Sequence, residues 1–96
     1  MARMIVSVRD KRLLEILAGR TPKRFPVGLA VTVERRMGLL VTAESLDDLR
    51  LPPGNRLEAL KGDRAGQHSI RVNDQWRICF RRTPDGASDV ELVDYH

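Results

Sequence analysis

Cysteine is almost missing from this chain, and its scarcity excludes two kinds of scaffold. Cys79 is the single cysteine among 96 residues, so an internal disulfide and a cysteine-rich zinc site are both ruled out. The two histidines, His68 and His96, do not have the sequence spacing of a metal-binding motif. We therefore expect neither a metal ion nor another cofactor.

Long apolar runs are missing as well. No stretch approaches the ~18 apolar residues that a membrane-spanning helix needs. The apolar run MIVSV near the amino terminus is too short to act as a signal peptide. We expect a soluble cytoplasmic protein without a membrane partner, folded as a single domain over residues 1–96.

Charge is distributed unevenly along the chain. Residues 83–96 contain four acidic side chains and no lysine or arginine, whereas residues 51–82 contain seven basic and three acidic ones. The whole chain has a net charge of +4 and a pI near 10.0. A pI above ~9 is typical of proteins that bind nucleic acid. A well-solvated basic surface or an acidic protein partner is equally compatible with this composition, so charge alone leaves three alternatives open.

The beginning of the chain predicts a strand followed by a short helix. Residues 3–8, RMIVSV, are β-branched and apolar, as in a short strand. Asp10 is placed to cap the helix, and Gly19 is placed to end it. The apolar stripe of this helix is predicted to consist of Leu13, Leu14 and Leu17.

A second helix is predicted from about Val27 to Thr42. Four apolar residues recur there at helical spacing: Leu29, Val33, Met37 and Leu40. The valines and threonines of this range are stiff at χ1 and also fit strands, so an extended structure is the alternative. Ser45 is placed to cap one further turn, LDDL, whose aspartates suit the positive end of the helix dipole.

After the break LPPGN the apolar period changes from 3.6 to 2, which predicts strands in the second half of the chain. RLEALKG and HSIRVN are predicted strands, and His68 would lie at the surface where the second one opens. The strand QWRICFRR follows a turn at ND, and VELVDY follows a longer turn at TPDGASD. Within QWRICFRR the alternation buries Trp76, Ile78 and Phe80 and places Arg77, Cys79 and Arg81 on the opposite face.

Together these elements predict an α+β fold with an N-terminal strand, two helices and then a twisted antiparallel sheet of three to four strands. The helices would cover one face of the sheet. The other face would collect cations, because Lys61 and Arg64 flank the turn KGDRAG and neighbouring strands lie ~5 Å apart. The arginines that project from the paired strands are Arg71, Arg77 and Arg81.

Such closely spaced cations are tolerated when water separates them or when an anion binds among them. A phosphate chain is the natural anion, because arginine binds phosphate through two parallel hydrogen bonds and lysine acts as a point charge. A solvated sheet face is the alternative. Flanking arginines could also lower the pKa of the Cys79 thiol and make it nucleophilic, whereas a lone cysteine in a strand is more often a small packing residue.

The segment RLEALKGDRAGQHSIRVNDQWRICF, followed by VDYH, resembles the HigB branch (plasmid maintenance killer proteins) of the RelE toxin superfamily over roughly residues 45–96. The resemblance implies a small microbial-ribonuclease-like fold that binds the ribosomal decoding site and cleaves mRNA there. It implies a HigA-like helix-turn-helix antitoxin as partner, and binding of operator DNA through the antitoxin complex. The implied catalytic residues are Lys61, Arg77, Tyr95 and His96 with Asp94 beside them. The residues that we expect to bind RNA on the basic sheet face are Arg64, Arg71, Arg81 and Arg82.

Cleavage without a metal is chemically reasonable if the 2′-hydroxyl of the RNA attacks the adjacent phosphate. The enzyme must then help to remove a proton, neutralise the phosphorane and protonate the leaving oxygen. His96 suits proton transfer, since an unperturbed histidine has a pKa near ~6.5. Lys61 and Arg77 would supply fixed positive charge, and Tyr95 could stack on a base or donate a proton.

One position departs from the family pattern. Several relatives carry a histidine three residues before the lysine of LKG, where this chain has Glu58. Either Glu58 acts as the base, or His96 carries more of the chemistry, or the activity is weak; a surface carboxylate paired with Arg56 or Lys61 is a further alternative. The departure also motivates a second hypothesis, in which the chain is a weakly active or non-toxic relative that binds the antitoxin as a co-repressor.

Overall fold

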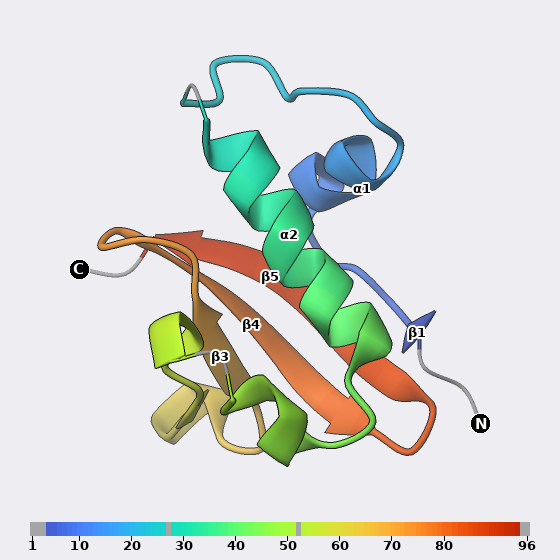
Figure 1. Ribbon diagram of the computed structural model, residues 1–96, viewed down its shortest axis with the longest axis vertical. Coiled ribbons are helices and arrows are strands. Elements are labelled where there is room, and N and C mark those ends of the chain that lie inside the picture. Colours follow the sequence, from blue (N-terminus) through green and yellow to red (C-terminus); the bar gives the residue numbers. More distant parts are fainter. Residues whose placement is uncertain (1–3, 27, 52, 95–96) are drawn as a thin grey trace.

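The computed structural model describes residues 4–26, 28–51 and 53–94 of the chain. Within these ranges a five-stranded sheet carries the two helices on one face, with α2 lying across β4 and β5 (Figure 1). The α+β prediction is therefore confirmed. The elements are β1 (Met4–Ile5), α1 (Lys11–Leu17), α2 (Leu29–Thr42), β2 (Glu58–Ala59), β3 (His68–Arg71), β4 (Trp76–Thr83) and β5 (Gly86–Asp94).

The strand order in the sheet is β1-β5-β4-β3-β2. From β2 to β5, each strand is antiparallel to its neighbour. Strand β1 joins the other edge in parallel with β5. The predicted strand 3–8 is paired at Met4–Ile5 and again only at Val8, opposite Val90. Between these points β5 carries an irregularity at Asp89, whose φ is 52°, and its N–H donates to the Ser7 hydroxyl.

Helix α2 confirms the predicted apolar stripe. Leu29, Val33, Met37 and Leu40 are all buried against the sheet side of the core. The β-branched residues do not prevent the helix, and within it the hydroxyl of Thr32 donates to the carbonyl of Gly28 and that of Thr42 to the carbonyl of Gly38. Burial of one apolar face favours the helix over the extended alternative, as it usually does for residues with a low intrinsic helix propensity.

Helix α1 corrects a prediction. Leu13 and Ile16 are its buried residues, while Leu14 and Leu17 are 51% and 48% exposed. The predicted stripe is therefore wrong for Leu14 and Leu17. A helix of two turns buries only a narrow face, and the i, i+3 pair selected here is the one that faces the rest of the core.

The orientation of α1 is fixed by Asp10, which connects it to the sheet. The carboxylate accepts hydrogen bonds from the Arg12 N–H at 3.0 Å, as the predicted cap, and from the Leu92 N–H in β5 at 3.1 Å. The Arg12 guanidinium also binds Asp10, donates to the Leu92 carbonyl and lies 5.5 Å from the centre of the Trp76 ring. Burial alone would raise the pKa of Asp10, but the hydrogen bonds from Arg12 and Leu92 outweigh it and lower the pKa below 3.8.

The turns of the second half differ in part from the predictions. The ND turn is confirmed, since the Asn73 side chain accepts the N–H groups of Gln75 and Trp76. The predicted long turn TPDGASD is wrong: only Pro84 and Asp85 separate the strands, and β5 already starts at Gly86, whose φ is 137°. The predicted Ser45 cap is wrong as well, because no side-chain hydrogen bond caps the turn Leu46–Leu49.

Replacing Asp10 with Asn is expected to lower the free energy of unfolding at pH 7 by about 2 kcal/mol. The amide can still cap the helix, but the ion pair with Arg12 and the charged character of the hydrogen bonds from Arg12 and Leu92 are lost. The folded-state pKa of Asp10 is lowered, so this stabilisation is present above pH 3.8 and disappears as the pH falls through the folded-state value. Urea unfolding of both proteins at neutral and acidic pH measures the effect.

Asp47→Asn is the matched control, because that carboxylate is 88% exposed and pairs only with exposed Arg50 among the described residues. It should change the free energy of unfolding by less than about 0.5 kcal/mol. An equal loss in both variants would contradict a special role of Asp10.

Candidate nucleic-acid interface

The sheet face that points away from the helices will be called the outward face. Antiparallel pairing places Glu58, Ser69, Cys79 and Glu91 in one row across β2, β3, β4 and β5. Arg71 and Arg77 are opposite each other in the next row. The sequence alternation therefore predicted the direction of these side chains correctly.

Arg77 points to the outward face but is buried there, with 7% of its side chain exposed. Its Nε donates to the Ser69 hydroxyl at 2.7 Å, and its Nη2 donates to the Arg56 carbonyl at 2.5 Å. The same Nη2 lies 3.2 Å from Oε1 of Glu58, on the edge strand β2. The sequence alternatives pair Glu58 with Arg56 or Lys61, whereas the ion pair in the structure is with Arg77.

The other arginines of the outward face also have carboxylate partners. Arg64 donates to Glu91 at 2.7 Å and to the Gln67 side-chain oxygen at 3.0 Å, and so reaches from the turn Gly62–Arg64 to β5. Arg71 pairs with Asp74, and Arg81 lies 3.8 Å from Asp89. The crowded cations are thus compensated by carboxylates of the chain itself, an alternative that the sequence prediction did not include.

Gly66 marks the place where Arg81 packs onto the β2–β3 connection. A Cβ at Gly66 would lie 2.6 Å from a guanidinium nitrogen of Arg81, and its φ of 91° also suits glycine. The guanidinium of Arg81 therefore rests directly on the backbone of the KGDRAG turn.

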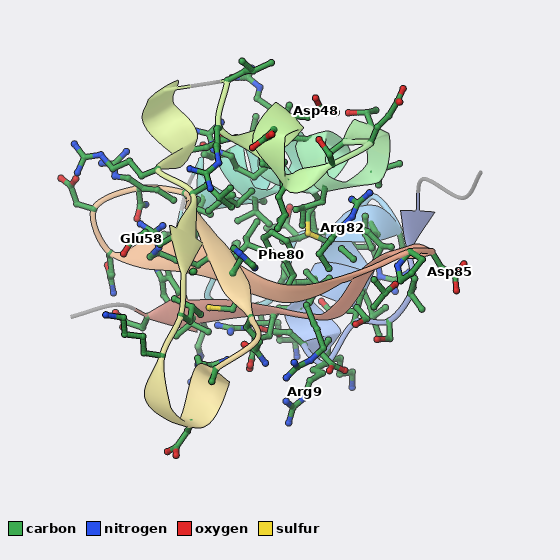
Figure 2. All side chains as sticks on the ribbon, turned by 90° about the horizontal axis from the view of Figure 1, so that it is seen from below. Arg9, Asp48, Glu58, Phe80, Arg82 and Asp85 are labelled. Carbon is green, nitrogen blue, oxygen red and sulfur yellow. The ribbon has the colours of Figure 1, made fainter. Side chains whose placement is uncertain are left out.

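Arg82 lies on the other side of the sheet, separate from this group. Its guanidinium donates to the carbonyl oxygens of Ala43 and Glu44, at 3.1 and 2.9 Å, where α2 ends. Figure 2 shows Arg82 well apart from Glu58, with Phe80 between them. A cation at a helix carboxyl end is a structural arrangement that satisfies carbonyl groups without partners in the helix.

Two of the remaining predicted catalytic residues, Lys61 and Asp94, lie near the end of β2 and at the end of the described part of β5. Lys61 is exposed immediately before the turn Gly62–Arg64. Asp94 ends the described part of β5 opposite Trp76, next to Arg77 along β4, and accepts a hydrogen bond from Gln75 at 3.1 Å. Tyr95 and His96 are outside the described residues.

Cys79 is buried and His68 is half-buried, so neither side chain is freely exposed. Cys79 is completely buried, and burial raises the pKa of its thiol; Glu91 adds to the rise, while Arg64 and Arg77 oppose it. The nucleophile alternative is therefore wrong and the packing alternative is right. The surface prediction for His68 is also wrong, because its ring stacks on buried Phe80 with 6.3 Å between the centroids, and its Nδ1 is buried.

Sequence reasoning missed the residues that compensate the arginines: Ser69, Glu91 and Asp89. A signal for Glu91 was present, since it alternates onto the same face of β5 as the arginines on β4. Within the described ranges, no group of three or more histidine, cysteine or acidic side chains is arranged to hold a metal ion. None of the helices there is long and apolar enough to cross a membrane.

Comparison with known proteins identifies the family of the chain, and the α+β fold agrees with it. The family model described as "RelE-like toxin of type II toxin-antitoxin system HigB" matches residues 7–96. The chain belongs to the HigB-like toxin family. Toxin HigB-1 of Vibrio cholerae serotype O1 is 35% identical over 94 residues, which cover 97% of this chain and 98% of the relative. An "Uncharacterized protein" of Haemophilus influenzae is 35% identical over 77% of this chain and 73% of its own length.

Membership confirms the resemblance and extends it to most of the N-terminal half, where only the layout of elements pointed to HigB-like toxins. It also implies that the chain has an antitoxin partner, because the family consists of the toxins of type II toxin–antitoxin systems.

The buried thiol of Cys79 is expected to resist alkylation in the folded protein. Its raised pKa keeps it protonated at neutral pH, and the fold excludes the reagent. Iodoacetamide followed by mass spectrometry should detect no labelling in the time that labels a urea-unfolded sample completely. Equal labelling of the folded and unfolded samples would instead support a reactive cysteine.

Proposed function

We propose that this HigB-like toxin is a cytoplasmic endoribonuclease that cleaves mRNA on the ribosome and thereby inhibits translation. The observation that carries the proposal is the guanidinium of Arg77, held at the outward face by Ser69 and the Arg56 carbonyl. A fixed cation of this kind suits a phosphate whose negative charge increases in the transition state, because no reorganisation is needed as the charge develops.

In the proposed reaction the 2′-hydroxyl attacks the neighbouring phosphorus, the bond to the 5′-oxygen breaks, and a cyclic phosphate is left. Arg77 and exposed Lys61 stabilise the phosphorane. His96 takes part in moving the proton from the attacking 2′-hydroxyl or to the leaving 5′-oxygen, as the family resemblance implies. Tyr95 stacks on a base or donates a proton to the RNA. Asp94, the residue before this pair, ends β5 opposite Trp76 in the strand register and would help to hold Tyr95 and His96 at this end of the sheet.

The charge balance of the outward face supports the proposed dependence on the ribosome. The arginines proposed to bind RNA, Arg64, Arg71 and Arg81, pair with Glu91, Asp74 and Asp89. A phosphate chain must compete with these carboxylates, so free RNA should bind weakly. The ribosome would supply the orientation that the toxin alone does not provide. We therefore expect little cleavage of free RNA.

A second candidate function is supported by the same compensated charges. A weakly active or non-toxic family member would act mainly as the partner of a HigA-like helix-turn-helix antitoxin, and would reach operator DNA through that complex. Tight antitoxin binding without any cleavage of mRNA on purified translating ribosomes would favour this function over the nuclease.

Lys61→Ala is expected to lower the rate of mRNA cleavage on translating ribosomes by about 100-fold, because one fixed cation is removed from the transition state. Since Lys61 is exposed, the free energy of unfolding should hardly change. His96→Ala should reduce the rate in the same assay by removing the proton-transfer group. Mapping mRNA 5′ ends after a short pulse of expression detects the cleavage in cells.

Lys23→Ala, on the exposed connector between α1 and α2, is the matched control for the loss of one lysine. It should keep near-wild-type cleavage. Equal effects of the Lys61 and Lys23 substitutions would contradict the assigned site, and efficient cleavage of free RNA would contradict the ribosome dependence.

A further inference from the structure

The ion pair between Arg77 and Glu58 joins two residues in very different surroundings. The side chain of Arg77 is 7% exposed, while that of Glu58 is 54% exposed, and the distance from Nη2 to Oε1 is 3.2 Å. Glu58 belongs to a strand of two residues at the edge of the sheet, so few contacts hold it in place. The carboxylate therefore covers a buried cation from the solvent side.

Arg77 can keep its position when this carboxylate moves away. Its guanidinium donates to three neutral oxygens of the chain: the Ser69 hydroxyl, the Ser69 carbonyl and the Arg56 carbonyl. The Arg56 carbonyl is presented by a backbone with a φ of 44°, a left-handed conformation that costs energy for a residue other than glycine. The site thus fixes the cation independently of Glu58.

The pair of Arg64 with Glu91 does not have this asymmetry. Its two side chains are 34% and 24% exposed, and Glu91 lies in the interior of β5, paired with Cys79. Glu91 is held in the interior of the long strand β5, so its carboxylate cannot move far from an anion that replaces it. Glu58 is therefore the carboxylate that an incoming anion can replace most easily.

We propose that Glu58 is an internal anion that occupies the side of Arg77 meant for a phosphate of the RNA, and that RNA binds by displacing it. Carboxylate and phosphate oxygens bind guanidinium through the same charge-assisted hydrogen bonds, so the two compete for one edge of the cation. The inference rests on the proposed function of the outward face as an RNA site. It assigns Glu58 to the control of affinity, in place of the role of catalytic base.

The test is the equilibrium binding of a fluorescent single-stranded RNA hexamer with 2′-O-methyl groups, which cannot be cleaved by 2′-hydroxyl attack. Glu58→Gln preserves the shape of the side chain and removes its charge. Fluorescence anisotropy should show about two- to fivefold tighter binding, as expected for the loss of one half-exposed competing ion pair.

The salt dependence of the affinity identifies the cause. Because RNA displaces Glu58 in the wild type as well, Arg77 contacts phosphate in both complexes, so the slope of log K against log salt should be the same for Glu58→Gln and the wild type. A slope steeper by about 0.7 in Glu58→Gln would mean that Arg77 reaches the phosphate only when the carboxylate is absent, and would overturn the displacement. Asp63→Asn is the matched control, since it removes an exposed carboxylate from the neighbouring turn Gly62–Arg64, and Asp63 forms no ion pair with Arg77 among the described residues. It should leave the affinity nearly unchanged.

Equal gains in affinity from Glu58→Gln and Asp63→Asn, or weaker binding of RNA by Glu58→Gln, would overturn the inference. Its failure can be told from failure of the proposed function. If Lys61→Ala abolishes ribosomal cleavage while Glu58→Gln gains no affinity, the nuclease stands and the displacement is wrong. If neither the wild type nor any variant cleaves mRNA but Glu58→Gln still gains affinity with an unchanged salt slope, the displacement stands without the nuclease.

Discussion

A buried guanidinium has to find partners for its donors, and that requirement organises the outward half of this molecule. Arg77 cannot be desolvated without acceptors, because an unpaired buried cation costs several kcal/mol. Ser69, the Arg56 carbonyl and Glu58 provide these acceptors. All three belong to the segment that runs from the 3-10 turn Pro53–Asn55 to β3. The short edge strand β2 is therefore tied to the sheet by more than its own ladder, which pairs only two residues with β3.

The two faces of the sheet are stabilised by different physics. Under the helices, apolar side chains such as Val33 and Phe80 are fully buried, and Asp10 fixes the angle at which the chain enters α1. On the outward face, hydrogen-bonded ion pairs take the place of a second apolar layer, and only Cys79 is a fully buried apolar side chain among the outward residues of β4. A face of this kind can open toward an anion without exposing a hydrophobic core.

Periodicity predicted which way most side chains point, but not how far they are covered. The period of 2 placed Arg77 and Cys79 on the outward face correctly, yet both are buried. The Arg56 carbonyl and Glu58 lie against the guanidinium of Arg77, and Arg64 reaches from the turn Gly62–Arg64 across to Glu91. That contact joins residues far apart in the sequence, so no local pattern contains it. The same limit explains Leu14: a stripe shows that a helix is amphipathic, while the contacts of Asp10 with β5 select which leucine is buried. Family motifs pointed to Lys61 and Arg77, but only the structure identified Glu58 as the carboxylate partner of Arg77.

The exchange of histidine for Glu58 acquires a physical meaning from this register. A neutral histidine at that position would remove one carboxylate from the guanidinium of Arg77, whereas Glu58 keeps a negative charge 3.2 Å from its Nη2. The substitution therefore changes the electrostatics of the phosphate site even if the proton transfers are carried by other residues. Since the buried cation keeps three neutral acceptors in either case, the fold tolerates both residues. What differs is the free energy needed to exchange an internal anion for RNA.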